Sequence, residues 1–129
     1  MTIAEALSSA DTLKPNVHPR EAKIAWLSNL DGFIYNNIWM RYERTADEHT
    51  LPDAFPGYDT STDESTELLV SYPFTDIYRF WLEAQIDLAN GELDKYNSSA
   101  LLYKNALDEY SAYYVRMHRP LCAVHSLKV

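Results

Sequence analysis

A repeat of apolar residues three and four positions apart sets the strongest constraint on how this chain can fold. It consists of Leu93, Tyr96, Ala100, Tyr103, Leu107, Tyr110, Tyr114 and Met117. Because an α-helix turns once every 3.6 residues, this spacing places them along one side of a helix, as in a coiled-coil seam. A helix from about Glu92 to His118 would be about 40 Å long. We expect most of the seam to pack inside the subunit, with surface left for a partner.

A short helix is predicted at the start of the chain, from about Ile3 to Leu13. Thr2 and Glu5 have the spacing of a capping box, in which each side chain satisfies a backbone N–H of the other residue. Pro15 disfavours helical geometry in the residue before it, so the helix should end there.

A longer helix is predicted from about Pro19 to Tyr42. Proline at the first helical position needs no partner for an N–H group. The apolar residues that follow at helical spacing are Ile24, Leu27, Leu30, Ile34 and Ile38. Gly32 lies inside this helix, where it costs about 1 kcal/mol relative to alanine. Either a close helix crossing requires it or the loss is simply tolerated.

A further helix is predicted from about Asp76 to Ala89, with Thr75 as candidate N-cap and Asn90-Gly91 as its stop signal. Its polar residues form one narrow stripe, and most of its other residues are apolar. Such a helix needs neighbours on several sides. The stripe consists of Asp76, Arg79, Glu83, Asp87 and Asn90.

Length and composition agree with an all-α fold. The chain has 129 residues, which fits one domain, and 47% hydrophobic content, which fits a folded core. Only 3 glycines occur, fewer than a turn-rich β-sandwich needs. We predict one helical domain over residues 1–129, a small bundle of about four helices. An acidic loop at about 45–74 separates the second and third helices, and a tail covers about 119–129.

The charge and the single cysteine narrow the classes of function. A net charge of −8 repels phosphate, so we expect no sequence-specific binding of nucleic acid. No apolar run approaches the roughly 20 residues that span a bilayer, and residues 1–5 do not resemble a signal peptide. Cys122 is the only cysteine, which excludes an intrachain disulfide and favours a reducing compartment.

The acidic loop invites a calcium interpretation. Asp59, Ser61 and Asp63 match the first ligand positions of an EF-hand loop, but Glu64 stands where glycine is needed and Val70 where a bidentate glutamate is needed. We therefore expect no metal there. The loop is either an assembly surface or a solvated loop whose apolar residues pack back onto its own helices.

No enzyme or cofactor site is predicted elsewhere. His118, Cys122 and His125 have a spacing that zinc tolerates, but a fourth ligand is missing. Glu83 and Asp87 share a helix face, as many solvated carboxylates do. The chain lacks the P-loop, the dinucleotide fingerprint and the common hydrolase and metalloprotease motifs. We expect no catalytic, cofactor-binding or metal-binding residues.

Aromatic and acidic residues mark a candidate interaction surface. The chain holds 10 Tyr, 3 Trp and 4 Phe, and large aromatic side chains with a polar tip are enriched at interfaces. Most of them must still pack the core. The candidate surface consists of Trp39, Tyr42, Phe55, Tyr58, Asp59, Asp63, Glu64 and Glu67.

Several segments resemble the head–tail connector, or adaptor, proteins of tailed phages and prophages. They are Leu13–Asn16, Lys23–Gly32, Phe55–Tyr58, Glu67–Val70, Ile86–Glu92 and Tyr96–Asn97. The resemblance implies a structural subunit of a homo-oligomeric ring that joins the portal protein to the tail or stopper proteins and extends the DNA channel. It implies the bacterial host cytoplasm during assembly and then the head–tail junction of the virion. The family has no residue-level functional motif to transfer.

A small helical adaptor or regulator of cellular origin is the alternative class, which would act by placing a helix in a groove. Portal, protease and major capsid genes upstream would favour the connector over the adaptor.

Overall fold

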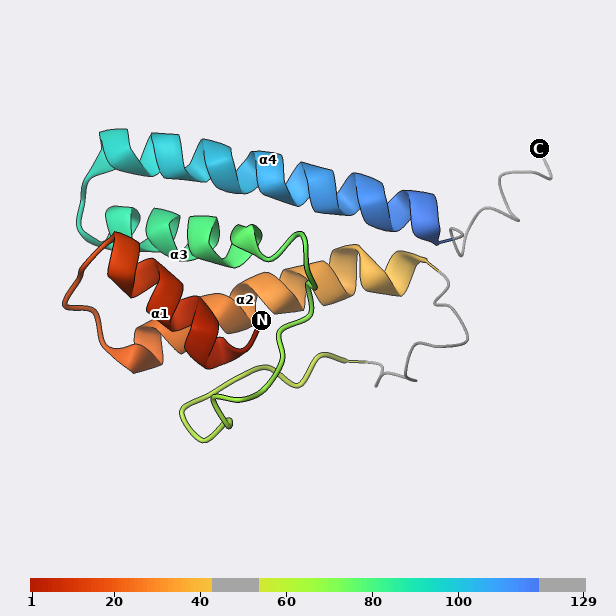
Figure 1. Cartoon of the computed structure of the whole chain (residues 1–129), viewed down its shortest axis with the longest axis horizontal. Coiled ribbons are helices and arrows are strands. Elements are labelled where there is room, and N and C mark those ends of the chain that lie inside the picture. Colours follow the sequence, from red (N-terminus) through yellow and green to blue (C-terminus); the bar gives the residue numbers. More distant parts are fainter. Residues whose placement is uncertain (43–53, 119–129) are drawn as a thin grey trace.

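The computed structural model describes residues 1–42 and 54–118, which form four α-helices and one short 3-10 helix (Figure 1). The elements are α1 (Ile3–Leu13), α2 (Arg20–Asn37), η1 (Trp39–Arg41), α3 (Asp76–Ala89) and α4 (Leu93–Met117). This part of the chain contains no strand. The predicted all-α fold of about four helices is confirmed.

The ends of α1 and α3 follow the local signals. The Thr2 hydroxyl accepts a hydrogen bond from the Glu5 N–H, and the Glu5 carboxylate accepts one from the Thr2 N–H. These bonds to Thr2 lower the pKa of Glu5. After α3 the chain turns at Gly91, whose φ of 74° is a conformation that favours glycine. Thr75 occupies the N-cap position of α3 but makes no side-chain capping bond.

The prediction that the second helix continues to Tyr42 was wrong at its C-terminal end. The α-helix ends at Asn37, and Trp39–Arg41 form a tighter 3-10 turn. The Trp39 indole N–H donates to the Tyr110 hydroxyl at 2.7 Å, and the indole ring stacks on Tyr114. These contacts with α4 direct Trp39 away from a continued α-helical path.

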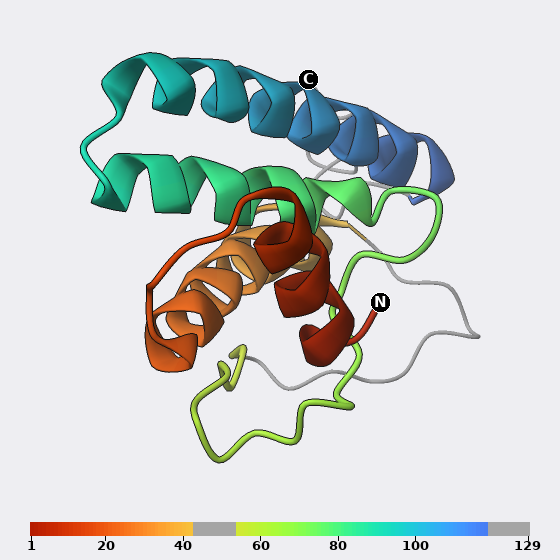
Figure 2. The same cartoon turned by 60° about the vertical axis from the view of Figure 1, so that its left-hand side comes forward.

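The helices form an antiparallel hairpin with two further helices on one side of it. Figure 1 shows α3 and α4 running in opposite directions, with α1 and α2 on the side of α3 away from α4. Figure 2 shows the same order from another direction. Among the described helices, the backbone of α4 contacts α3 alone, whereas α3 also contacts α1 and α2.

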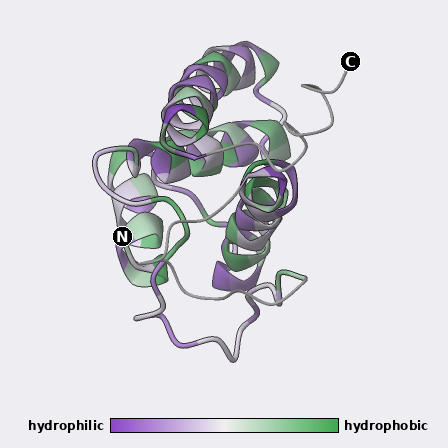
Figure 3. Cartoon of the chain, turned by 90° about the vertical axis from the view of Figure 1, so that its right-hand side faces the viewer, coloured by the Kyte–Doolittle hydropathy of each residue, from purple (hydrophilic) through white to green (hydrophobic). Residues whose placement is uncertain are grey.

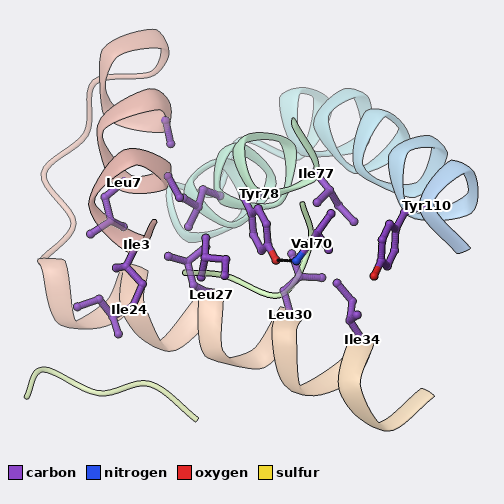
Figure 4. Close-up of a cluster of buried hydrophobic side chains, with 14 of the residues drawn as sticks. Ile3, Leu7, Ile24, Leu27, Leu30, Ile34, Val70, Ile77, Tyr78 and Tyr110 are labelled. Atoms are coloured by element: carbon purple, nitrogen blue, oxygen red, sulfur yellow. Dashed lines mark hydrogen bonds between the residues drawn. The ribbon is translucent and has the colours of Figure 1, made fainter. Parts of the chain in front are cut away.

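The core therefore lies between α1, α2 and α3 (Figure 4). Of the α4 seam, only Tyr110 and Tyr114 are buried, and the end residues Leu93 and Met117 are 63% and 58% exposed. The buried apolar residues of the other elements include Ile3, Leu7, Ile24, Leu27, Leu30, Ile34, Leu68, Val70, Ile77 and Leu82.

Trp81 lies at the border between this core and α4. Its ring is half-buried and packs against Tyr103, with the ring centroids 4.8 Å apart. Its indole N–H donates to the Trp26 carbonyl at 2.7 Å, which links α3 to α2. The side chain therefore connects the α1–α2–α3 core to the hairpin instead of filling the centre.

The segment after residue 54 is attached to the first turn of α1. The Ile3 N–H donates to the Thr66 carbonyl, the Ala4 N–H to the Glu64 carbonyl, and the Leu68 N–H to the Met1 carbonyl. The first amides of an α-helix have no partner within the helix, so these bonds satisfy them. Residues 64–68 are thus held beside the start of the chain.

Two glycines should respond oppositely to alanine. A Cβ on Gly32 would lie 3.6 Å from Phe55, an ordinary contact, so Gly32→Ala should raise the free energy of unfolding by about 0.5–1 kcal/mol through helix propensity. Gly57 has a φ of 79°, and a Cβ there would lie 3.1 Å from the Ser28 hydroxyl. Gly57→Ala should therefore lower the free energy of unfolding by about 1 kcal/mol or more.

Urea titration of both variants measures these changes. A loss of stability in Gly32→Ala would mean that the Phe55 contact cannot adjust and that this glycine is required.

Candidate functional site

A buried carboxylate, Asp31 on α2, accepts hydrogen bonds from two other segments of the described chain. It is 0% exposed. One carboxylate oxygen accepts hydrogen bonds from the Tyr58 hydroxyl at 2.6 Å and the Leu69 N–H at 3.1 Å. The other accepts one from the Tyr78 hydroxyl at 2.7 Å. The Tyr78 hydroxyl in turn accepts a hydrogen bond from the Val70 N–H at 2.7 Å, which Figure 4 shows as a dashed line. Three segments, α2, α3 and residues 58–70, therefore meet at one side chain.

The environment of Asp31 opposes its ionisation. Burial raises its pKa above the ordinary value of 3.8, although the bonds from Tyr58, Tyr78 and the Leu69 N–H act in the opposite direction. Burial also raises the pKa values of Tyr58 and Tyr78, and the nearby carboxylate adds to both shifts. Both hydroxyls therefore keep their protons and act as donors.

Sequence reasoning did not single out Asp31. Its position contains a signal, because it lies four residues after Leu27 and three before Ile34, in the middle of the apolar face of α2. A carboxylate at such a position must be paired or hydrogen-bonded. The donors could not be identified in advance, since they lie 27 to 47 residues further along the chain.

Asp87, which the sequence places in the polar stripe of α3, is a second buried carboxylate. Asp87 is 1% exposed, and both its oxygens lie within 2.7 Å of the Lys14 ammonium group. The Ser99 hydroxyl donates to it at 2.8 Å. Asp87 therefore joins the end of α1 to α3 and α4 and is not part of a solvated carboxylate pair with Glu83.

Four members of the candidate interaction surface form what we call the acidic edge: Asp59, Asp63, Glu64 and Glu67. All four are exposed. Asp59 and Asp63 accept bonds from the backbone and hydroxyl groups of Ser61 and Ser65, which lower their pKa values. Glu64 pairs with Arg20, and Glu67 with the terminal ammonium of Met1. Their carboxylates point outward, while Leu68 and Val70 beside them are buried.

The four aromatic members are half-buried and take part in internal packing. Phe55 lies 5.7 Å from Tyr35 and 5.3 Å from Tyr58, measured between ring centroids. Tyr42 meets the Tyr114 ring edge-on, and Trp39 stacks on the same ring. The structure therefore divides the candidate surface into an outward acidic edge and aromatic residues that face the helices.

The part of the chain described here contains no group of three His, Cys, Asp or Glu side chains close enough to share a metal ion. Cys122 and His125, two of the three residues whose spacing zinc tolerates, lie outside the described residues. In the region of the calcium motif, Asp59 and Asp63 each accept hydrogen bonds within their own turns.

Comparison with known proteins yields no relative. No family model, no curated protein and no solved structure matches the chain. Within residues 1–42 and 54–118, no helix has the length and apolar character needed to cross a membrane.

Asp31→Ala should lower the free energy of unfolding by about 2–4 kcal/mol near pH 4, because Tyr78 and the Leu69 N–H would lose a buried acceptor. The difference from the wild type should depend on pH. The native state holds the Asp31 proton above pH 3.8, where the unfolded chain releases it, so this residue's stabilisation is complete at lower pH and declines as pH rises through the raised pKa.

Urea titrations between pH 3 and 7 test this, with Glu21→Ala, an exposed carboxylate on the same helix, as the control. A loss below about 1 kcal/mol, or one that does not shrink as pH rises, would contradict the assigned role of the network.

Proposed function

We propose that the protein is a non-catalytic structural subunit that assembles with copies of itself into the head–tail connector ring of a tailed phage or prophage. The observation that carries this proposal is the outer face of α4. This helix packs against the rest of the chain along one side, and large apolar residues remain exposed on its other sides.

The exposed residues of α4 form the first assembly surface. Leu101 is 59% exposed, Leu102 48% and Val115 41%. Apolar and polar residues alternate around the helix in Figure 3. Burying one such side chain fully is worth about 1.5–3 kcal/mol, so a neighbour that covers several of them gains substantial free energy. Single exposed leucines are ordinary, but several on one long helix favour an interface.

The acidic edge forms the second surface. Figures 1 and 2 show the part of the segment around residue 60 on the side of the molecule opposite to α4. A ring requires two different complementary surfaces on each subunit, because its contacts run head to tail. Residues 54–75 carry no basic residue, whereas α4 has no net charge, because its three basic residues (Lys95, Lys104 and Arg116) balance its three acidic residues (Asp94, Asp108 and Glu109). The α4 face of one copy can therefore meet the acidic edge of the next without net repulsion.

The charge of the subunit also fits a channel component. A net charge of −8 keeps the protein from holding the DNA backbone, so DNA could move past such a ring without binding it. Portal protein on one side and tail or stopper proteins on the other are the proposed partners.

Leu101→Glu together with Leu102→Glu should abolish self-assembly while the fold remains intact, because both side chains are already largely exposed in the subunit. Val17→Glu, at a position 96% exposed in the α1–α2 connection, is the matched control. Light scattering and electron microscopy, with and without a portal ring, give the assembly state. A wild type that stays monomeric in both conditions would refute the proposal and favour a helical adaptor.

Neutralising the acidic edge should impair function without unfolding the protein. In Asp59→Asn/Asp63→Asn/Glu64→Gln/Glu67→Gln, the asparagines keep an acceptor for their turns, and the lost ion pairs are at the surface. The thermal midpoint should hardly change, while a phage or prophage that encodes this chain should yield fewer infectious particles. Glu21→Gln/Asp76→Asn, two exposed carboxylates elsewhere, should leave the yield normal. Normal yield from the quadruple variant would eliminate a functional role for the acidic edge.

A further inference from the structure

A groove lined mainly by aromatic side chains lies at the C-terminal end of α4. We call it the aromatic groove, and its volume is about 340 Å³. One wall comes from α4, and the other comes from η1 and the segment that precedes α3. Its floor includes the buried Tyr110 and Tyr114, and its rim includes Met117, which is 58% exposed. The lining residues are Trp39, Leu69, Ser71, Tyr110, Tyr113, Tyr114, Met117 and His118.

The described chain ends in the wall of this groove. His118 follows the last residue of α4, and its backbone is extended, with φ −134° and ψ 143°. Its ring stacks on Tyr114 with the ring centroids 3.7 Å apart and the planes 9° apart. The following residues therefore begin at the groove itself.

Those residues have the composition that the groove would accept. Leu121, Cys122, Ala123 and Val124 form an uninterrupted apolar run. Residues 119–129 contain two of the 11 basic residues of the chain and none of its 19 acidic residues. Their charge is therefore opposite to that of the body on which they would lie.

Chain length and connectivity favour the tail of the same copy as the occupant. Only two residues, Arg119 and Pro120, separate His118 from Leu121, and an extended chain spans about 3.3 Å per residue, so the apolar run is within reach of the groove. A tethered segment acts at an effective concentration in the millimolar range, well above that of a segment on a separate molecule.

We propose that Leu121–Val124 occupies the aromatic groove of its own chain and covers Tyr113 and Met117. This intramolecular contact does not depend on the ring proposed above, because the groove and the apolar run belong to the isolated subunit. It adds a layer of apolar contacts to the end of α4, which the described helices cover only with α3 and the Trp39 side chain of η1.

The single native cysteine allows a direct test in the full chain. Ser71 is exposed and lines the groove, so Ser71→Cys places a second thiol where Cys122 should lie. Mild oxidation should give an intramolecular disulfide, visible as a faster-migrating monomer on a non-reducing gel, because a disulfide needs Cα atoms within about 7 Å. Ser8→Cys, on the exposed side of α1, is the control and should not cross-link within the chain.

Two results of that experiment would overturn the proposal. A disulfide-linked dimer formed by Ser71→Cys but not by Ser8→Cys would assign the groove to the tail of a second copy. Cross-linking no faster than in the Ser8→Cys control would mean that the tail does not visit the groove.

Thiol modification provides an independent measurement that needs no new cysteine. Cys122 in the wild type should react at least about tenfold more slowly than in Leu121→Asp/Val124→Asp, because docking shields the thiol until the tail opens. Leu127→Asp, beyond the apolar run, should react like the wild type. Equal rates in the wild type and the double variant would contradict docking.

Discussion

The fold depends most on one buried acceptor. Apolar contacts between α1, α2 and α3 are non-directional and do not by themselves select one register of the helices. The Asp31 carboxylate does select one register, because a buried carboxylate needs hydrogen-bond donors. Its donors lie on α3 and on the segment before α3. Sliding α3 or residues 58–70 along α2 by one helical turn would leave a buried carboxyl group without hydrogen-bond donors. The surrounding leucines and isoleucines stabilise the packed helices, and the carboxylate determines their register.

Ion pairs hold α1 against the other helices. Lys14 pairs with the buried Asp87 and Lys23 pairs with Asp11, so that α1 is held against both α3 and α2. The inner side of α4, in contrast, meets its neighbours largely through half-buried aromatic rings, such as Tyr103 against Trp81. The molecule is therefore most firmly constrained on the side of α1 and α2, and α4 is the element with the most surface left for other contacts.

The sequence predicts features that arise from neighbouring residues and misses those that arise from distant ones. The capping box at Thr2 and the turn at Gly91 are local, and the bounds predicted for α1 and α3 are correct. The break after Asn37 has no glycine or proline to announce it, since it follows from contacts of Trp39 with α4. In the candidate surface, the acidic residues are outward as solvated carboxylates should be. The inward placement of its aromatic residues required contacts that only the folded chain defines.

The attachment of residues 64–68 to the first turn of α1 has a consequence for the order in which the protein folds during synthesis. An 11-residue helix is marginal on its own in water, and the apolar face of α1 has nothing to cover it when it leaves the ribosome. The carbonyls of Glu64 and Thr66, which complete its first turn, emerge only after the whole of α2. The helix that is made first must therefore wait for a later segment, and the N-terminal third of the chain leaves the ribosome before it can form a closed unit.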